Sequence, residues 1–189
     1  DQAALDAQRT ARGEQGRLHL GYVSSAMYDS KLPGLLRRLR ADWPGIELSL
    51  VQGDVQMLYE ALLDLRLDIA IIRAPLPSLP DDLQSRPFAS EKTVLALYRQ
   101  HPLAGSAALT LSSVKDEKWI SLRDPEGMGL EQYFYDACSG AGFQPDVVQN
   151  ASDVPTVISL VSAGFGLALL PASAKAVSVE NVVYVDILD

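Results

Sequence analysis

The sequence predicts an α/β fold made of two Rossmann-like lobes with a ligand cleft between them. Strand-like and helix-like segments alternate along the first part of the chain, a proline-rich stretch interrupts them, and a second alternating set follows. Because each helix returns the chain to the same edge of a sheet, this alternation predicts parallel strands. The 189 residues, of which 48% are hydrophobic, are enough for a sizeable core.

The first lobe is expected to begin with a strand after Gly16, because apolar residues alternate there. Leu18, Leu20 and Tyr22 share one face of this strand. A leucine stripe over residues 32–39 then predicts an amphipathic helix. The other elements expected in this lobe are a strand at 46–50, a helix at 55–65 and a strand at 66–72.

The stretch RAPLPSLPDD, which contains three prolines, separates the two alternating sets. A long strand-like run over residues 84–98 leads into the second lobe. The closing segment VVYVDI, residues 182–187, reads as one more strand, and we expect it to return toward the first lobe. The elements expected in the second lobe are strands at 118–122, 146–150 and 167–170 and helices at 130–140 and 154–163.

Two glycines surround a phenylalanine in LVSAGFGLALLP, residues 160–171, a pattern that also occurs in phosphate-binding loops. The order of the elements argues against such a loop, because the apolar spacing before Gly164, which Phe165 continues, predicts that a helix comes first. Asp153 is well placed to cap the start of this helix. Gly164 is therefore predicted to end the helix in the left-handed conformation.

Composition and charge exclude several kinds of site. A formal net charge of −8 would repel a phosphate backbone, so the chain is not expected to bind DNA by itself. Cys138 has no second cysteine to pair with, and we expect it on a helix surface and without a peroxide-sensing role. Two histidines, His19 and His101, are too few for a zinc cluster, so we expect neither a metal nor a cofactor.

Membrane insertion and catalysis are also not expected. No apolar stretch of eighteen residues occurs, and residues 1–16 do not resemble a signal peptide, which predicts a cytoplasmic protein without a membrane partner. An acyl- or phosphoryl-transfer enzyme would need a base beside Ser24 or Ser25, and His19 is expected to be structural or solvent-facing. We therefore predict no catalytic residue.

Polar residues follow the predicted strands where parallel sheets place their ligands, at the carboxyl ends. They offer hydroxyl groups, backbone amide donors and one guanidinium, which suit a small anion or polar molecule. Two alternatives stay open: Ser, Asp and Asn also cap helices without binding a ligand, and the arginine is equally a solvated loop residue. The candidate binding residues are Ser24, Ser25, Gly53, Asp54, Arg73, Asn150, Ala151 and Ser152.

Five stretches in succession resemble one family, the effector-binding domains of LysR-type transcriptional regulators. RGEQGRLHLGYVSS looks like that family's junction between a linker helix and the first regulatory strand. The segment that contains WPGIEL is similar to the helix, strand, helix and strand that follow. HPLAGSAALTLSSVKDEKWISL, AGFQP and VSAGFGLALLP match the second lobe in order and spacing.

The resemblance implies a fold like that of type 2 periplasmic binding proteins, with a small effector, often a carboxylate or aromatic acid, bound between two lobes. It assigns the eight candidate residues to effector binding. The pair Gly53 and Asp54 stands where some family members have Ser or Thr after the second strand, and the charge of Asp54 argues against a diacid effector unless Arg73 balances it. The implied domains are a linker-helix remnant at 1–15, lobe I at 16–88 and 182–189, and lobe II at 89–181.

Partners are implied by the same resemblance. The family's helix-turn-helix is absent from these residues, so DNA contact is expected only through an N-terminal domain of the full protein. Homodimers, and tetramers at full length, are expected to use residues 32–39 as a contact surface, and RNA polymerase is a candidate further partner. The alternative function is a periplasmic solute-binding protein of a transporter, which would have the same fold and cleft.

Overall fold

The computed structural model describes residues 15–76 and 78–188. The chain divides into two compact units, unit 1 (Asp1–Ile72) and unit 2 (Arg73–Asp189), in agreement with the predicted two-lobed α/β class. The division falls after Ile72, so the proline-rich stretch belongs to unit 2, whereas the sequence placed the boundary at residue 88. The predicted linker remnant at 1–15 lies, apart from Gln15, outside the described residues.

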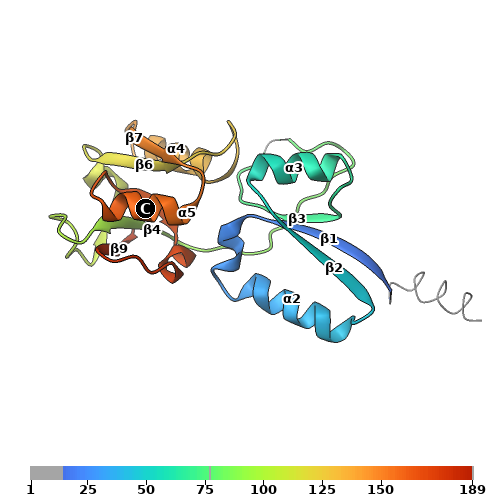
Figure 1. The fold of residues 1–189 in the computed structure, drawn as a ribbon. Coiled ribbons are helices and arrows are strands. Elements are labelled where there is room, and N and C mark those ends of the chain that lie inside the picture. The colour runs from blue at the N-terminus through green and yellow to red at the C-terminus, as the bar shows by residue number, and fades with distance from the viewer. Residues whose placement is uncertain (1–14, 77, 189) are drawn as a thin grey trace, which may run out of the picture. The chain divides into compact units, whose positions relative to one another are not determined.

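Unit 1 has a three-stranded sheet with a helix on each face (Figure 1). Strand β1 pairs in parallel with both β2 and β3, which gives the order β2-β1-β3 and confirms the predicted crossovers. The elements are β1 (Gly16–Tyr22), the 3-10 helix η1 (Ser24–Met27), α2 (Lys31–Asp42), β2 (Ile46–Gln52), α3 (Val55–Leu63) and β3 (Ile69–Ile71).

The third strand is shorter than the sequence predicts, because it covers Ile69–Ile71 rather than residues 66–72. The backbone N–H groups of Arg66 and Leu67 donate to the Ala61 carbonyl, at 2.8 and 3.1 Å, and so close the end of α3. Leu65 has a positive φ of 56°, which reverses the chain at this point. The residues after α3 therefore complete the helix before the strand begins.

The side chains of β1 alternate between the two helices. Leu20 packs with Leu32 and Leu36 of α2 in a buried cluster. On the other face, a Cβ at Gly21 would lie 2.7 Å from a methyl group of Leu58 in α3. The missing side chain at Gly21 thus lets α3 approach the sheet closely.

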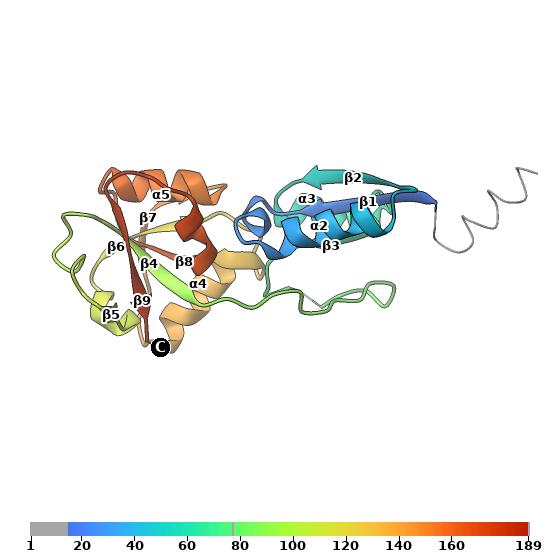
Figure 2. The same ribbon diagram turned by 90° about the horizontal axis from the view of Figure 1, so that it is seen from below.

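Unit 2 has a mixed sheet with α4 and α5 on opposite sides (Figure 2). Strand β4 is antiparallel to β8 and β9, whereas β5 is parallel to β9 and β6 is parallel to β7. The elements are β4 (Thr93–Tyr98), β5 (Ala108–Leu109), the 3-10 helix η2 (Leu111–Val114), β6 (Lys118–Leu122), α4 (Gly129–Gly140), β7 (Asp146–Ala151), α5 (Val154–Ser162), β8 (Ala168–Pro171), the 3-10 helix η3 (Ala172–Ala176) and β9 (Val182–Ile187).

Two hydrogen bonds of Leu167 join the strand groups β5-β9-β4-β8 and β6-β7. The Leu167 N–H donates to the Lys118 carbonyl, and the Leu167 carbonyl accepts from the Ile120 N–H, both at 2.8 Å. The bridge is parallel, so the carboxyl ends of β6, β7 and β8 lie at the same edge of unit 2.

Two predictions for the strands of unit 2 are wrong. Residues 182–187 do form a strand, but β9 pairs with β4 and β5 and does not return to the first lobe. Val185 is buried in the unit 2 core and Val183 packs against it, which explains this placement. The predicted strand at 84–98 is confirmed only for Thr93–Tyr98, because the preceding residues have no strand beside them to pair with.

The end of α5 confirms the predicted role of Gly164, which has a φ of +77°. The Gly164 N–H donates to the Val161 carbonyl and the Phe165 N–H donates to the Leu160 carbonyl, the pairing that closes a helix with a left-handed glycine. Phe165 lies beyond the helix and is 49% exposed, so its predicted place in the helical stripe is wrong. Asp153 caps the start of α5 as predicted.

The core of unit 2 forms around Trp119, which contacts Phe134 of α4 with ring centroids 5.1 Å apart. Cys138, one helical turn after Phe134, belongs to the same cluster and is fully buried. The prediction that Cys138 lies on a helix surface is therefore wrong. None of the helices in the described residues is long and apolar enough to span a bilayer.

Gly166 is the residue whose substitution we expect to be most disruptive to this sheet. A Cβ at this position would lie 2.6 Å from the Lys118 carbonyl oxygen, so Gly166→Ala should lower the free energy of unfolding by about 2 kcal/mol through overpacking. Gly140→Ala is the matched control, because nothing lies within 4 Å of a Cβ there. Urea unfolding curves measure both, and equal stability of the two variants would contradict this account.

Burial raises the pKa of the Cys138 thiol to about 12. At pH 8 only on the order of one thiol in ten thousand is then ionised, and the thiolate is the reactive form. We therefore expect iodoacetamide to leave native Cys138 unmodified at pH 8 and to alkylate it in urea. Mass spectrometry before and after unfolding gives the result, and rapid labelling of the native protein would show that α4 opens.

Candidate functional site

The carboxyl ends of the three strands of unit 1 are held together by backbone hydrogen bonds. The Gly53 N–H donates to the Tyr22 carbonyl at 3.2 Å, and the Val23 N–H donates to the Ile71 carbonyl at 3.1 Å. These bonds place the start of η1 beside the turn between β2 and α3. The structure thus brings the predicted residues Ser24, Ser25, Gly53 and Asp54 to one edge of unit 1.

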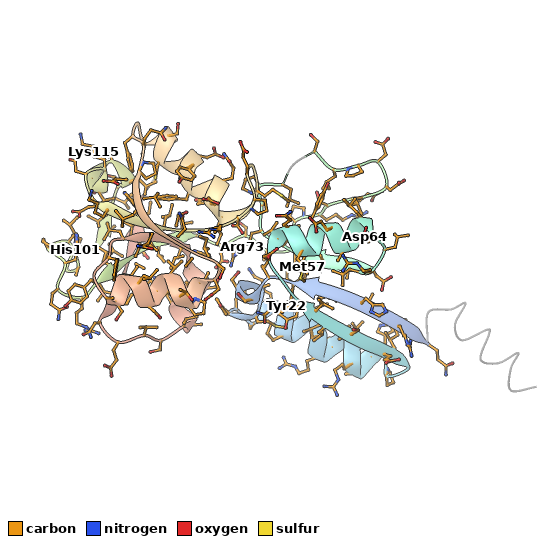
Figure 3. The ribbon with its side chains drawn as sticks, turned by 45° about the horizontal axis from the view of Figure 1, so that its top comes forward. Tyr22, Met57, Asp64, Arg73, His101 and Lys115 are labelled. Atoms are coloured by element: carbon orange, nitrogen blue, oxygen red, sulfur yellow. The ribbon has the colours of Figure 1, made fainter. Side chains whose placement is uncertain are left out.

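Within this group, Asp54 caps α3, since its Oδ1 accepts the Met57 N–H at 2.7 Å. A Cβ at Gly53 would collide with the side chain of Met57, which is labelled beside Tyr22 in Figure 3. Ser25 is buried at 6% exposure, whereas Ser24 is half-buried. Gly53 therefore leaves room for the Met57 side chain, and Asp54 caps the helix.

The predicted residues of the second lobe lie at the carboxyl end of β7. Asn150 and Ala151 are the last two residues of that strand, and Ser152 follows it. Ala151 is buried, and its carbonyl accepts the Arg123 N–H at 2.8 Å, which ties this point to the end of β6. Because β6 lies between β7 and β8, the ends of β7 and β8 are about 10 Å apart.

Arg73 lies at the same edge of unit 2, near the end of β8. Its Nη1 donates to Glu91 Oε1 at 3.2 Å, and Glu91 Oε2 accepts the Ser173 N–H at 2.8 Å. Glu91 precedes β4, and Ser173 follows β8 in η3. The side chains of Arg73 and Glu91 are 18% and 26% exposed.

Sequence reasoning missed Glu91 and Ser173. Glu91 stands inside a run that was read as one continuous strand, and Ser173 lies beyond Pro171 with no strand-end pattern of its own. Their neighbourhood depends on the antiparallel pairing of β4 with β8, in which Thr93 lies opposite Pro171. Register between strands far apart in the chain leaves no local signal that would have found them.

In each of three helices, an amide of the first turn is bonded to one of the chain's own carboxylates. Besides Asp54 in α3, Asp153 Oδ1 accepts the Thr156 N–H of α5 at 2.9 Å. At α4, Asp124 Oδ2 accepts the Leu130 N–H at 2.8 Å. Amides at helix starts commonly bind anions, and here carboxylates of the protein take that place. An anionic ligand would therefore compete with these carboxylates for the helix amides, and Arg73 offers it a side-chain donor.

The arrangement offers donors for noncovalent binding. Among the described residues no cluster of His, Cys, Asp and Glu could hold a metal ion. His101 Nε2 lies 3.4 Å from Glu117, and His101 Nδ1 accepts the Leu103 N–H. A pocket of about 160 Å³ beside His101 and Phe165 lies at the other end of unit 2 from Arg73 and contains none of the predicted residues (Figure 3).

Comparison with known proteins identifies relatives along nearly the whole chain. A family model described as the LysR substrate binding domain matches residues 11–189. The transcriptional regulator AlsR of Bacillus subtilis is 38% identical over 178 residues, which cover 94% of this chain and 58% of AlsR. The regulator BudR of Raoultella terrigena is 36% identical over 183 residues, which cover 96% of this chain and 63% of BudR.

Solved structures share the fold. The effector-binding domain of QuiR in complex with shikimate superposes with a TM-score of 0.81 at 21% identity, over 93% of this chain and 82% of that chain. The effector-binding domain of BenM with benzoate gives 0.76 at 24% identity, over 92% and 78%. At these identities the likeness concerns the fold, which is type 2 periplasmic-binding-protein-like.

The capping role of Asp54 can be separated from its charge. Asp54→Ala removes the acceptor for the Met57 N–H and should lower the free energy of unfolding by about 1 kcal/mol. Asp54→Asn keeps a side-chain acceptor without the charge and should stay within a few tenths of a kcal/mol of the native protein. Chemical denaturation measures both, and an unchanged stability of the alanine variant would argue against the cap.

Proposed function

The chain belongs to the family of LysR substrate binding domains, and from this premise we propose that it senses a small metabolite for a LysR-type transcriptional regulator. The observation that carries the proposal is the family match over residues 11–189. Relatives that cover most of this chain, AlsR and BudR, are named as transcriptional regulators, which favours this function over a periplasmic solute-binding protein. Catalysis has no part in the proposal.

The effector that fits best is a small monoanion. The similar domains of BenM and QuiR bind benzoate and shikimate. Arg73 supplies a guanidinium for one carboxylate, whereas Asp54 would repel a second carboxylate placed against it. We assign effector binding to Ser24, Ser25, Gly53 and Asp54 of unit 1 and to Arg73, Asn150, Ala151 and Ser152 of unit 2.

Signalling would follow from a population shift. Effector contacts that exist in only one arrangement of the regulator favour that arrangement by their differential free energy. An effector that bound all arrangements equally would switch nothing. The sensing function therefore requires contacts whose strength differs between the states of the full protein.

This chain spans 58% and 63% of the length of AlsR and BudR. We propose that a full-length regulator with this domain binds DNA through an N-terminal domain and works in the cytoplasm. Homodimers, and tetramers at full length, would form with residues 32–39 in the contact. Leu32 and Leu36 are buried within unit 1, so the outer face of α2, with Arg37 and Arg38, would meet the partner. RNA polymerase is a candidate further partner.

A thermal-shift screen tests the proposal. The panel consists of aromatic and aliphatic monocarboxylates, including benzoate and shikimate, with dicarboxylates, amino acids and sugars as comparison classes. A ligand at about a hundred times its Kd stabilises by roughly 2.7 kcal/mol, which raises Tm by several degrees in a domain of this size. We expect a monocarboxylate to produce the largest shift. Larger shifts from uncharged sugars would contradict an anion site.

Arg73→Ala should weaken the ligand found in this screen by about 1.5–3 kcal/mol, because it removes a charge-assisted hydrogen bond. Arg99→Ala is the matched control, since Arg99 is exposed at the other end of β4 and carries the same charge. Titration calorimetry gives both affinities. Equal affinity of the two variants would remove Arg73 from the site.

A further inference from the structure

The Glu91 carboxylate occupies the donors of the proposed anion site. One of its oxygens accepts from the Arg73 guanidinium at 3.2 Å and the other accepts from the Ser173 N–H at 2.8 Å. A guanidinium combined with a backbone amide is a donor set that proteins use to bind carboxylates. Here the carboxylate held in this way belongs to the protein itself.

The environment distinguishes this ion pair from the others. The side chains of Arg73 and Glu91 are 18% and 26% exposed, whereas those of the pairs Arg17–Glu47, Arg66–Asp64 and Lys118–Asp146 are all more than 50% exposed. Charges withdrawn from solvent are screened less, so a competing charge at this position has a larger effect.

A second observation points to a ligand at the same place. The Ser173 hydroxyl oxygen is buried and makes no hydrogen bond in the structure. Buried hydroxyl groups are normally bonded, and an unbonded one commonly marks the place of a ligand or water. The backbone N–H of Ser173 therefore donates to Glu91, whereas the Ser173 hydroxyl group has no hydrogen-bond partner in the structure.

We propose that Glu91 is the specificity-determining residue of the effector site, because its carboxylate competes with the effector carboxylate for Arg73 and Ser173. This inference rests on the proposed function. An effector carboxylate must displace Glu91 from these donors, so Glu91 lowers the affinity for every carboxylate relative to ligands that do not use these donors. A carboxylate then binds tightly only when its other contacts offset this cost. Effector binding and release of Glu91 are then the same event.

The experiment uses Glu91→Gln, which removes the charge and keeps an oxygen that accepts the Ser173 N–H. The probes are sodium acetate and sodium benzoate, titrated at constant ionic strength and followed by NMR chemical shifts. We expect the Kd of at least one probe to fall by about tenfold or more, because a neutral amide competes poorly for a guanidinium. In the double variant Arg73→Gln with Glu91→Gln, this gain should disappear.

Glu117→Gln is the matched control. It makes the same change in the same unit, next to His101 at the other end of the sheet, and should leave both Kd values unchanged. Thermal unfolding verifies that each variant is folded. Glu91→Ser replaces Glu91→Gln if the glutamine variant does not fold, since it also removes the competing charge.

Two outcomes would overturn the inference. If Glu91→Gln binds the probes as the native protein does or more weakly, Glu91 positions Arg73 rather than competing with the ligand. If the vacated donors take up neither probe in a saturable way, the competition does not exist. Loss of ligand binding in Arg73→Ala without a gain in Glu91→Gln refutes only the role of Glu91. Indifference of binding to both substitutions refutes the effector site itself.

Discussion

The close contact between Gly166 and the Lys118 carbonyl is the constraint on which unit 2 depends. It allows the Leu167 hydrogen bonds that join β6-β7 to the rest of the sheet. The same junction sets β6 and β8 parallel, so the end of β7 and the Arg73–Glu91 pair lie at one edge. A single residue without a side chain thus determines which polar groups are neighbours at the candidate site.

Several hydrogen-bond donors at this edge of unit 2 are already bonded to carboxylates of the protein. Carboxylates of Asp124 and Asp153 each accept from a first-turn amide of their helices, and Glu91 accepts from Arg73. In unit 1, Asp54 does the same for α3. A ligand therefore exchanges partners with groups that are already bonded, so its net gain at each contact is smaller than the new contact alone would give. Selectivity between two ligands then depends on how much the free energy of replacing the protein's own carboxylates differs from one ligand to the other.

Local patterns predicted most of the fold. Alternation identified β1, helical spacing identified α5, and Gly164 identified a helix end, because each follows from residues close in sequence. The errors concern long-range pairing: β9 stays in unit 2 through its register with β4, and Cys138 faces a core that Trp119 supplies from another element. Among the candidate residues, the strand ends predicted Arg73, whereas the neighbourhood of Glu91 and Ser173 depends on the β4–β8 register and had no local signal.

The third strand has a consequence for handling the isolated domain. β3 pairs with β1 on one side, no strand of the described part of the chain pairs with its other side, and its Ile69 is 48% exposed. An open edge with apolar side chains is a template for strand addition by another chain. The two outer strands of the unit 2 sheet are poorer templates for strand addition. β5 has only two residues, and β7 carries the polar residues Gln149 and Asn150. Self-association through amyloid-like pairing would therefore begin at the open edges of unit 1, which are β3 and also β2, whose Leu50 is 43% exposed. The substitution Ile69→Lys would act as a gatekeeper at the β3 edge.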